Sequence, residues 1–122
     1  MLVKQLLLIG LGGGIGSMMR FLVSKIPFEQ DSFPWATFVV NIVGCFLIGL
    51  LIGLSVLHLY WGRDMRLFLV TGFCGGFTTF STFSTENVSL YYSGNYFLLG
   101  AYILLSVIVG FAAVLLGLAL SK

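Results

Sequence analysis

The sequence predicts an all-α membrane protein of one domain with four transmembrane helices, on three observations. Of the 122 residues, 59% are hydrophobic and only 8% are charged, whereas soluble domains carry about 25% charged residues. The charges separate long apolar runs, and each run exceeds the roughly 20 residues that a helix needs to cross a bilayer. Strands of a membrane barrel are about 10 residues long, so these runs exclude a barrel. We expect helices at about residues 2–26, 35–59, 67–90 and 96–120.

The first helix contains the glycine-rich stretch GLGGGIG. This stretch has no preceding strand and no P-loop lysine, which excludes a nucleotide-binding loop. The N-terminal apolar run could be a signal peptide, but it has no small-residue cleavage site, so we expect this helix to be retained in the protein. Glycines four residues apart allow close backbone approach, either within one chain or between two copies. Such pairs are Gly10 with Gly14, Gly12 with Gly16 and, in the second helix, Gly49 with Gly53.

Two polar residues interrupt the first two helices. Arg20 precedes the end of the first helix, where it could extend its charge to the membrane surface or draw anions into a vestibule. Pro34 suits the first turn of the second helix, and Asn41 lies about two turns further on. An amide in hydrocarbon needs hydrogen-bond partners, so Asn41 could link helices or line a pathway.

The turn after the second helix, residues 60–66, carries a Tyr-Trp pair of the kind found at membrane interfaces.

The third helix contains the segment GFCGGFTTFSTFSTE at residues 72–86. Gly75 and Gly76 each disfavour a helix by about 1 kcal/mol relative to alanine. With the threonines that follow, they predict a break near mid-membrane. Non-helical backbone at that depth must be buried in protein or line a cavity, and its free carbonyl oxygens are ligands for a hard cation.

Beyond the break, aromatic and polar residues fall on opposite sides of the helix. At about 100° per residue, Phe77, Phe80 and Phe83 share one side. The hydroxyls could simply bond to their own helix while the rings face lipid. We favour a conduit for a small ion or solute, because the polar residues are too many for that simpler explanation. They are Thr78, Thr79, Ser81, Thr82, Thr85 and Glu86.

The fourth helix adds Tyr102 and Ser106, which are four residues apart and share a face with Gly110.

The sequence offers no set of catalytic residues. His58 is the only histidine and lies at a membrane edge, and no predicted helix holds two carboxylates, so we do not expect an enzyme.

Four helices enclose little space, so a transport pathway requires more than one copy of the chain. Hydroxyls and rings can serve ions of either sign.

The distribution of charge gives a slight topological bias. An even number of spans places both termini on one side, with four basic residues there against two on the other. Such a weak bias is compatible with insertion in both orientations, or with termini facing the cytoplasm. The first group comprises Lys4, Arg63, Arg66 and Lys122, and the second comprises Arg20 and Lys25.

Three segments, GGGIGSMMR (12–20), FPWATFVVNIVGCFLIG (33–49) and GFCGGFTTFSTFSTE (72–86), closely resemble the Fluc (CrcB) family of fluoride channels. The resemblance covers essentially the whole chain. It implies an antiparallel, dual-topology homodimer in the cell inner membrane, whose two pores export fluoride passively, with no nucleic-acid partner. It also implies a structural sodium ion at the dimer centre, held by backbone oxygens of Gly75 and Thr78.

The resemblance assigns the ion pathway as well. The paired phenylalanines of the family's pore match Phe80 and Phe83, and the vestibule arginine matches Arg20. Some members carry a serine where this chain has Gly110, so that position is left out. The other matching positions are Asn41, Ser81, Thr82, Glu86, Tyr102 and Ser106.

Two other functions stay open. A proton-coupled small multidrug exporter also has four helices, but it needs a carboxylate deep in the membrane, whereas the first helix has no acid and Glu86 lies toward the end of the third. A membrane assembly subunit that transports nothing is the second alternative.

Overall fold

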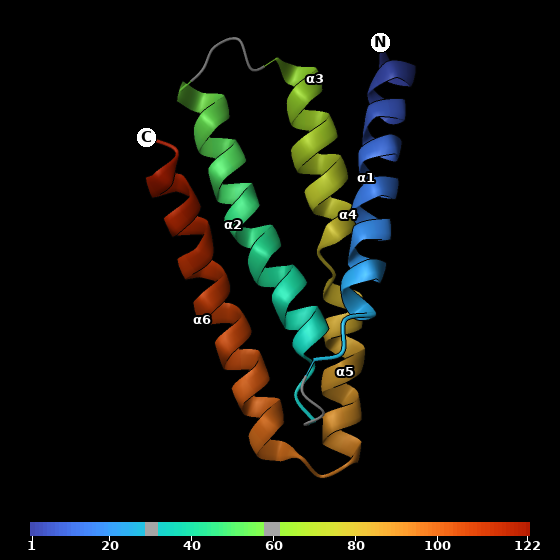
Figure 1. Cartoon of the computed structure of the whole chain (residues 1–122), viewed down its shortest axis with the longest axis vertical. Coiled ribbons are helices and arrows are strands. Elements are labelled where there is room, and N and C mark those ends of the chain that lie inside the picture. Colours follow the sequence, from blue (N-terminus) through green and yellow to red (C-terminus); the bar gives the residue numbers. More distant parts are fainter. Residues whose placement is uncertain (29–31, 58–61) are drawn as a thin grey trace.

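The computed structural model describes residues 1–28, 32–57 and 62–122 and is all-helical (Figure 1). Within these residues, four helical spans are long and apolar enough to cross a membrane. The predicted four-span α-helical fold is therefore confirmed, and the chain is a multi-pass membrane protein. The spans are Leu2–Ser24, Trp35–Val56, Arg63–Tyr92 and Tyr96–Leu120.

Three spans are single helices, and the third consists of several pieces. The single helices are α1 (Leu2–Ser24), α2 (Trp35–Leu57) and α6 (Tyr96–Leu120). The third span comprises α3 (Arg63–Arg66), the π-helix η1 (Leu67–Cys74), α4 (Gly75–Phe77) and α5 (Phe80–Tyr92). The expected end of the second helix at Leu59, His58 and the Tyr60-Trp61 pair lie outside the described residues.

The third span starts at Arg63, four residues before the expected start at residue 67. Asp64 lies in the first turn of α3, where a negative charge favours the helix N-terminus. Its carboxylate also forms an ion pair with Lys4 Nζ of α1, at 2.7 Å. These interactions extend the helix into a segment that its sequence marks as a polar turn.

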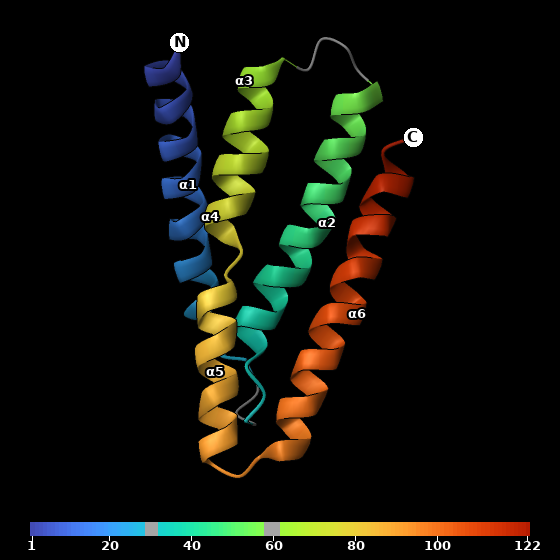
Figure 2. The same cartoon turned by 180° about the vertical axis from the view of Figure 1, so that it is seen from behind.

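The helices lie in a row, with α1 beside the third span, then α2, then α6 (Figures 1 and 2). α1 packs mainly on η1 and α4, and α2 packs along α6. Both chain termini lie at the same end of the molecule, as expected for an even number of spans. The third span therefore lies between α1 and α2, although in the sequence it is flanked by α2 and α6.

Some of the predicted glycine pairs pack within the chain. A Cβ atom at Gly12 or Gly16 would overlap the carbonyl oxygens of Phe68 and Phe73, respectively, so both glycines let α1 lie directly on η1. Gly10 and Gly14 differ, because no described atom lies within 4 Å of a Cβ built there. One glycine pair of α1 thus faces the bundle and the other faces outward.

The third span is broken, and the break lies at Thr78 and Thr79. Both residues have extended backbone, with φ and ψ of −83° and 159° at Thr78 and −150° and 122° at Thr79. Gly75 remains helical, at −62° and −37°. Gly76 serves close packing, because a Cβ there would overlap the carbonyl of Gly13 in α1. Gly76 thus lets the span lie against α1, and the two threonines interrupt the helix.

Substituting Gly76 tests this packing. We expect Gly76→Ala to lower the free energy of unfolding by about 1–3 kcal/mol, because the added methyl group would force α4 away from α1. Gly100→Ala is the matched control, since a Cβ at Gly100 meets no described atom and alanine favours the helix. Unfolding midpoints in detergent compare the two variants. Equal or higher stability of Gly76→Ala would contradict the packing argument.

The turn between α5 and α6 is a Schellman motif, which stops α5 at the end of the span. The N–H of Asn95 donates to the Leu90 carbonyl at 2.9 Å, and the N–H of Gly94 donates to the Tyr91 carbonyl at 3.1 Å. Gly94 has a φ of 80°, which glycine adopts without strain. The tight turn lets α6 run back toward the other end of the molecule, where it packs along α2.

Candidate functional site

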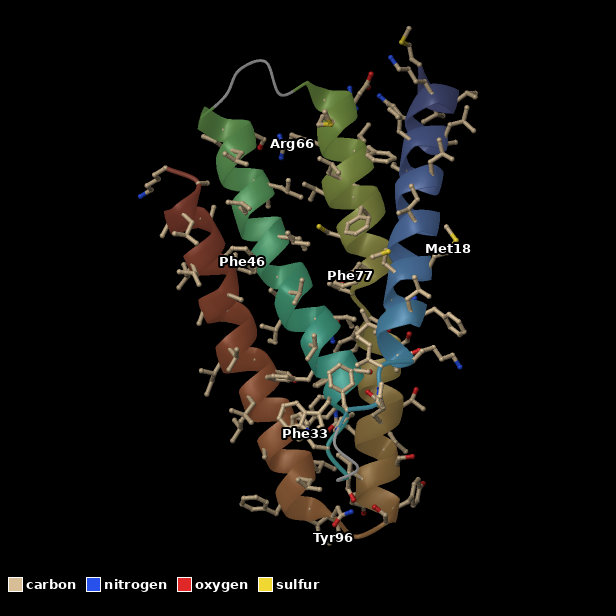
Figure 3. The ribbon with its side chains drawn as sticks, viewed as in Figure 1. Met18, Phe33, Phe46, Arg66, Phe77 and Tyr96 are labelled. Carbon is tan, nitrogen blue, oxygen red and sulfur yellow. The ribbon has the colours of Figure 1, made fainter. Side chains whose placement is uncertain are left out.

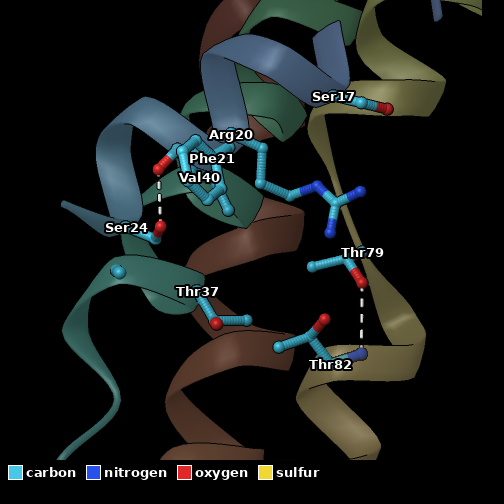
Figure 4. A pocket seen from close by; sticks show the side chains of 9 residues that line it. Ser17, Arg20, Phe21, Ser24, Thr37, Val40, Thr79 and Thr82 are labelled. Carbon is cyan, nitrogen blue, oxygen red and sulfur yellow. Dashed lines mark hydrogen bonds between the residues drawn. The ribbon is translucent and has the colours of Figure 1, made fainter. Parts of the chain in front are cut away.

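A cavity of about 390 Å³ lies where α1, α2 and the break meet (Figure 4). We name it the Arg20 pocket. The Nε of Arg20 and the hydroxyl of Ser17 both donate to the Gly76 carbonyl, at 3.2 and 3.4 Å. Arg20 is therefore held against the broken span and does not merely extend to the membrane surface. The pocket is lined by Ser17, Arg20, Phe21, Ser24, Ala36, Thr37, Val40, Thr79 and Thr82.

Asn41 supports the break from α2. Its Oδ1 accepts from the Thr79 N–H at 2.8 Å, and its Nδ2 donates to the Thr79 carbonyl at 3.1 Å. The Thr79 hydroxyl then caps α5 by accepting from the Thr82 N–H at 3.1 Å. Extended backbone in a membrane needs such partners, because lipid offers none. Asn41 thus links two helices, as one of its two predicted roles requires.

This arrangement frees two carbonyl oxygens. In a continuous helix the N–H groups of Thr79 and Thr82 would donate to the carbonyls of Gly75 and Thr78. They donate to Asn41 and to the Thr79 side chain instead. The freed carbonyls belong to Gly75 and Thr78, the residues for which the family resemblance implies sodium binding, and carbonyl oxygens are suitable ligands for a hard cation.

A second cavity, of about 340 Å³, lies on the other side of the break, and we name it the Phe pocket. The ring centroids of Phe80 and Phe83 are 5.9 Å apart. The buried hydroxyl oxygen of Ser106 has no hydrogen-bond partner among the described residues, so its proton is free for a ligand. The lining comprises Asn41, Cys45, Ile48, Thr78, Thr79, Phe80, Phe83, Ser106, Val107, Gly110 and Phe111.

Phe77 does not lie with Phe80 and Phe83. It is buried, with 6% of its surface exposed, and its ring stacks on Phe73 at 5.7 Å and lies toward α2 (Figure 3), where a Cβ at Gly44 would be 3.6 Å from it. The prediction that it shares a face with Phe80 and Phe83 is wrong, because the break reorients α5 relative to α4. A constant 100° per residue does not apply across Thr78 and Thr79.

Glu86 joins three helices below the Phe pocket. Its carboxylate accepts from the Thr37 hydroxyl of α2 at 3.0 Å and from the Tyr102 hydroxyl of α6 at 2.9 Å. Tyr102 is fully buried, and its ring meets Phe83 nearly edge-on at 4.8 Å. Glu86 also lines a third cavity, of about 450 Å³, among serine hydroxyls. The carboxylate therefore lies between the aromatic pair and the far end of the molecule.

Two hydroxyls of the predicted polar face lie elsewhere. Ser81 is exposed and its hydroxyl lies 3.3 Å from that of Thr79, but it lines none of the cavities described above. Thr85 is exposed and donates to the Ser81 carbonyl of its own helix at 2.8 Å. Thr85 therefore follows the simpler explanation, in which a hydroxyl donates to a carbonyl of its own helix. Sequence reasoning missed Thr37, although its position four residues before Asn41 places it on the same helix face.

Comparison with known proteins places the chain in a family. A family model described as "CrcB-like protein, Camphor Resistance (CrcB)" matches residues 7–118. A protein of Azobacteroides pseudotrichonymphae genomovar. CFP2 named "Fluoride-specific ion channel FluC" is 50% identical, over 99% of this chain and 98% of its own. Proteins of the same name from Phocaeicola vulgatus and Agrobacterium fabrum are 49% and 51% identical, covering 98% and 94% of this chain and 100% and 94% of theirs. Since both the model and the relatives match nearly its whole length, this chain belongs to the CrcB family.

Proposed function

We propose that this chain is a fluoride-specific ion channel, which lets fluoride leave the cell passively across the inner membrane. The proposal rests mainly on sequence similarity. Over nearly the whole chain, about half of the residues are identical to those of relatives named as fluoride-specific ion channels, a name that describes no enzyme. The cavities on both sides of a broken span support it, because they bring hydroxyls, an arginine and aromatic edges together.

The proposed pathway runs from the Arg20 pocket past the break to Glu86. Thr79 lines both the Arg20 pocket and the Phe pocket, so the two cavities adjoin at the break. The guanidinium of Arg20 attracts anions to the first cavity, where Thr82 offers a hydroxyl. Fluoride then passes Asn41, Phe80, Phe83 and Ser106, and leaves past the Tyr102–Glu86 pair. Ser81 lies beside this route, through its contact with Thr79.

The chemistry of these groups suits a small anion. Burying bare fluoride in a low-dielectric medium costs tens of kcal/mol, so the pore must replace water with donors. The Ser106 hydroxyl supplies a free proton, and the positive edges of the two phenylalanine rings add weaker attraction. Several modest contacts let the ion leave as readily as it enters, which conduction requires.

The proposed pore needs a second copy of the chain. Phe80 is 79% exposed in the single chain, so its ring cannot enclose an ion alone. The outward-facing Gly10 and Gly14 leave α1 open for close helix contact. We infer an antiparallel, dual-topology homodimer with two pores. The slight difference in basic residues between the two ends fits insertion in both orientations.

A sodium ion at the dimer centre completes the proposal. The freed carbonyl oxygens of Gly75, in the helical turn before the break, and of Thr78, in the extended break itself, would hold it. Both are hard oxygen ligands without charge. A bound cation would supply positive charge that offsets repulsion among anions nearby.

Thr37 provides a test of the pathway's last section. We expect Thr37→Val to lower fluoride flux about tenfold, because it leaves one oxygen of the Glu86 carboxylate without its donor, a loss of about 1–3 kcal/mol. Thr85→Val is the matched control, since Thr85 bonds only to its own helix. Fluoride efflux from liposomes compares both. Equal flux in the two variants would remove Thr37 from the pathway.

The proposed function is tested with the chain alone in liposomes. A fluoride electrode follows efflux with and without a proton gradient across the vesicle membrane. The proposal predicts fluoride efflux at the same rate in both conditions. Proton release driven by cationic drugs would instead identify a multidrug exporter, and vesicles that pass no ion would favour an assembly subunit. Either result overturns the proposal.

A further inference from the structure

A polar cavity close to the chain termini, away from the break, takes no part in the proposed pathway. It has a volume of about 390 Å³ and lies between α2 and the start of the third span, near the chain termini. Figure 3 shows Arg66 extending from the third span toward α2. The lining residues, which we name the Arg63/Arg66 pocket, are Ser55, Arg63, Arg66, Leu67, Val70 and Thr71.

The two arginines of this pocket carry positive charge that no described side chain neutralises. Neither guanidinium forms an ion pair within residues 1–28, 32–57 and 62–122. Asp64, the one described acidic side chain at this end, pairs with Lys4 at 2.7 Å. The other described acid, Glu86, is bonded to Thr37 and Tyr102 far from here. The pocket is therefore an electropositive cavity with free donors.

The π-helix adds a hydroxyl to the same wall. In a π-helix each N–H bonds five residues back, so Thr71 lies about one turn below Arg66. In an α-helix Val70 would lie there instead. The Thr71 hydroxyl forms no hydrogen bond within the described part of the chain, and Ser55 faces it from α2 with a hydroxyl that donates to Ile52 at 2.8 Å. A π-helix of eight residues is rare, and such segments frequently mark functional sites.

We propose that the Arg63/Arg66 pocket binds a phosphate group, supplied by an anionic membrane lipid. A guanidinium matches the oxygens of a phosphate with two parallel hydrogen bonds. The pocket lies where α3 begins the third candidate membrane span, so we place it at the depth of the lipid headgroups, and Leu67 and Val70 offer apolar contact for the adjoining acyl chain. Basic residues at this position attract anionic lipids. Free inorganic phosphate has the same chemistry and is the alternative source.

The experiment uses the full chain purified in bilayer discs of phosphatidylglycerol and phosphatidylcholine in equal amounts. Native mass spectrometry counts the lipids that stay bound. We expect the wild type to retain more phosphatidylglycerol than phosphatidylcholine. The double variant Arg63→Gln/Arg66→Gln should lose this enrichment, which should fall about fivefold for each arginine removed. Lys25→Gln/Lys122→Gln removes the same charge outside the pocket and should keep the enrichment.

Two further arms keep the proposal falsifiable. Thr71→Val keeps both charges and should weaken the preference severalfold, which provides a test even if the double arginine variant does not fold. Inorganic phosphate is titrated against discs of phosphatidylcholine alone, with thermal stability as the readout. Stabilisation that needs both arginines, without lipid enrichment, would retain the phosphate site and reject the lipid source. No enrichment and no stabilisation, or the same response in the double arginine variant, would overturn the proposal.

Discussion

Replacing Phe80 or Phe83 with isoleucine is expected to reduce fluoride flux at least about tenfold while the protein stays folded. The two rings lie 5.9 Å apart beside the Phe pocket, and Phe83 also contacts Tyr102 at 4.8 Å. Isoleucine keeps apolar bulk but has no ring, so it removes the positive ring edge that the proposed pathway turns toward the anion. Phe80 is 79% exposed in the single chain, so folding does not depend on it.

Efflux from liposomes measures this effect, and size-exclusion chromatography shows whether the proposed dimer persists. Phe97→Ile is the matched control, because this ring is 85% exposed, at the start of α6, and lines none of the cavities described above. The control should conduct like the wild type. Unchanged flux in both Phe80→Ile and Phe83→Ile would remove the aromatic pair from the pathway.

Asn41→Asp is expected to suppress flux to near background. Aspartate keeps the acceptor for the Thr79 N–H but loses the donor to the Thr79 carbonyl, and it adds a negative charge to the wall of the Phe pocket. Two like charges 4 Å apart repel by about 4 kcal/mol at an effective dielectric constant of 20, which corresponds to about a thousandfold in rate. The charge therefore outweighs the lost hydrogen bond.

A second substitution at the same position separates charge from support of the break. Asn41→Leu loses both hydrogen bonds to Thr79 and adds no charge. It should destabilise the protein more than Asn41→Asp and yet conduct more fluoride. Flux and unfolding midpoint are measured for both variants. An unaffected rate in Asn41→Asp would show that Asn41 does not line the pathway.

The four spans could be predicted because hydrophobic length alone determines them. A run of apolar residues longer than the bilayer requires can form only a helix there. Polar residues within such a run, like Asn41 and Glu86, are costly in lipid, so their burial against partners could also be expected. The structure provides these partners at Thr79, Thr37 and Tyr102.

Other features depend on tertiary packing and could not be predicted. No residue in LFLVTGFC marks a π-helix, and that geometry exists where η1 lies on the glycines of α1. The same packing accounts for Gly76, which stays close to α1 while the break falls two residues later. The break also separates Phe77 from the face that holds Phe80 and Phe83. A helical projection that assumes a continuous helix therefore puts Phe77 on the wrong face.

In the proposed pathway, aromatic edges and hydroxyls beside the broken span replace the water around fluoride. The ratio of fluoride to chloride efflux from liposomes that contain only this chain measures how well they do so. The donors suit a small anion that binds hydroxyl protons tightly, and the rings offer no fixed site for a larger one. The proposed pathway predicts fast fluoride efflux with chloride efflux near that of empty vesicles. Similar rates for the two ions, or none for either, would contradict it.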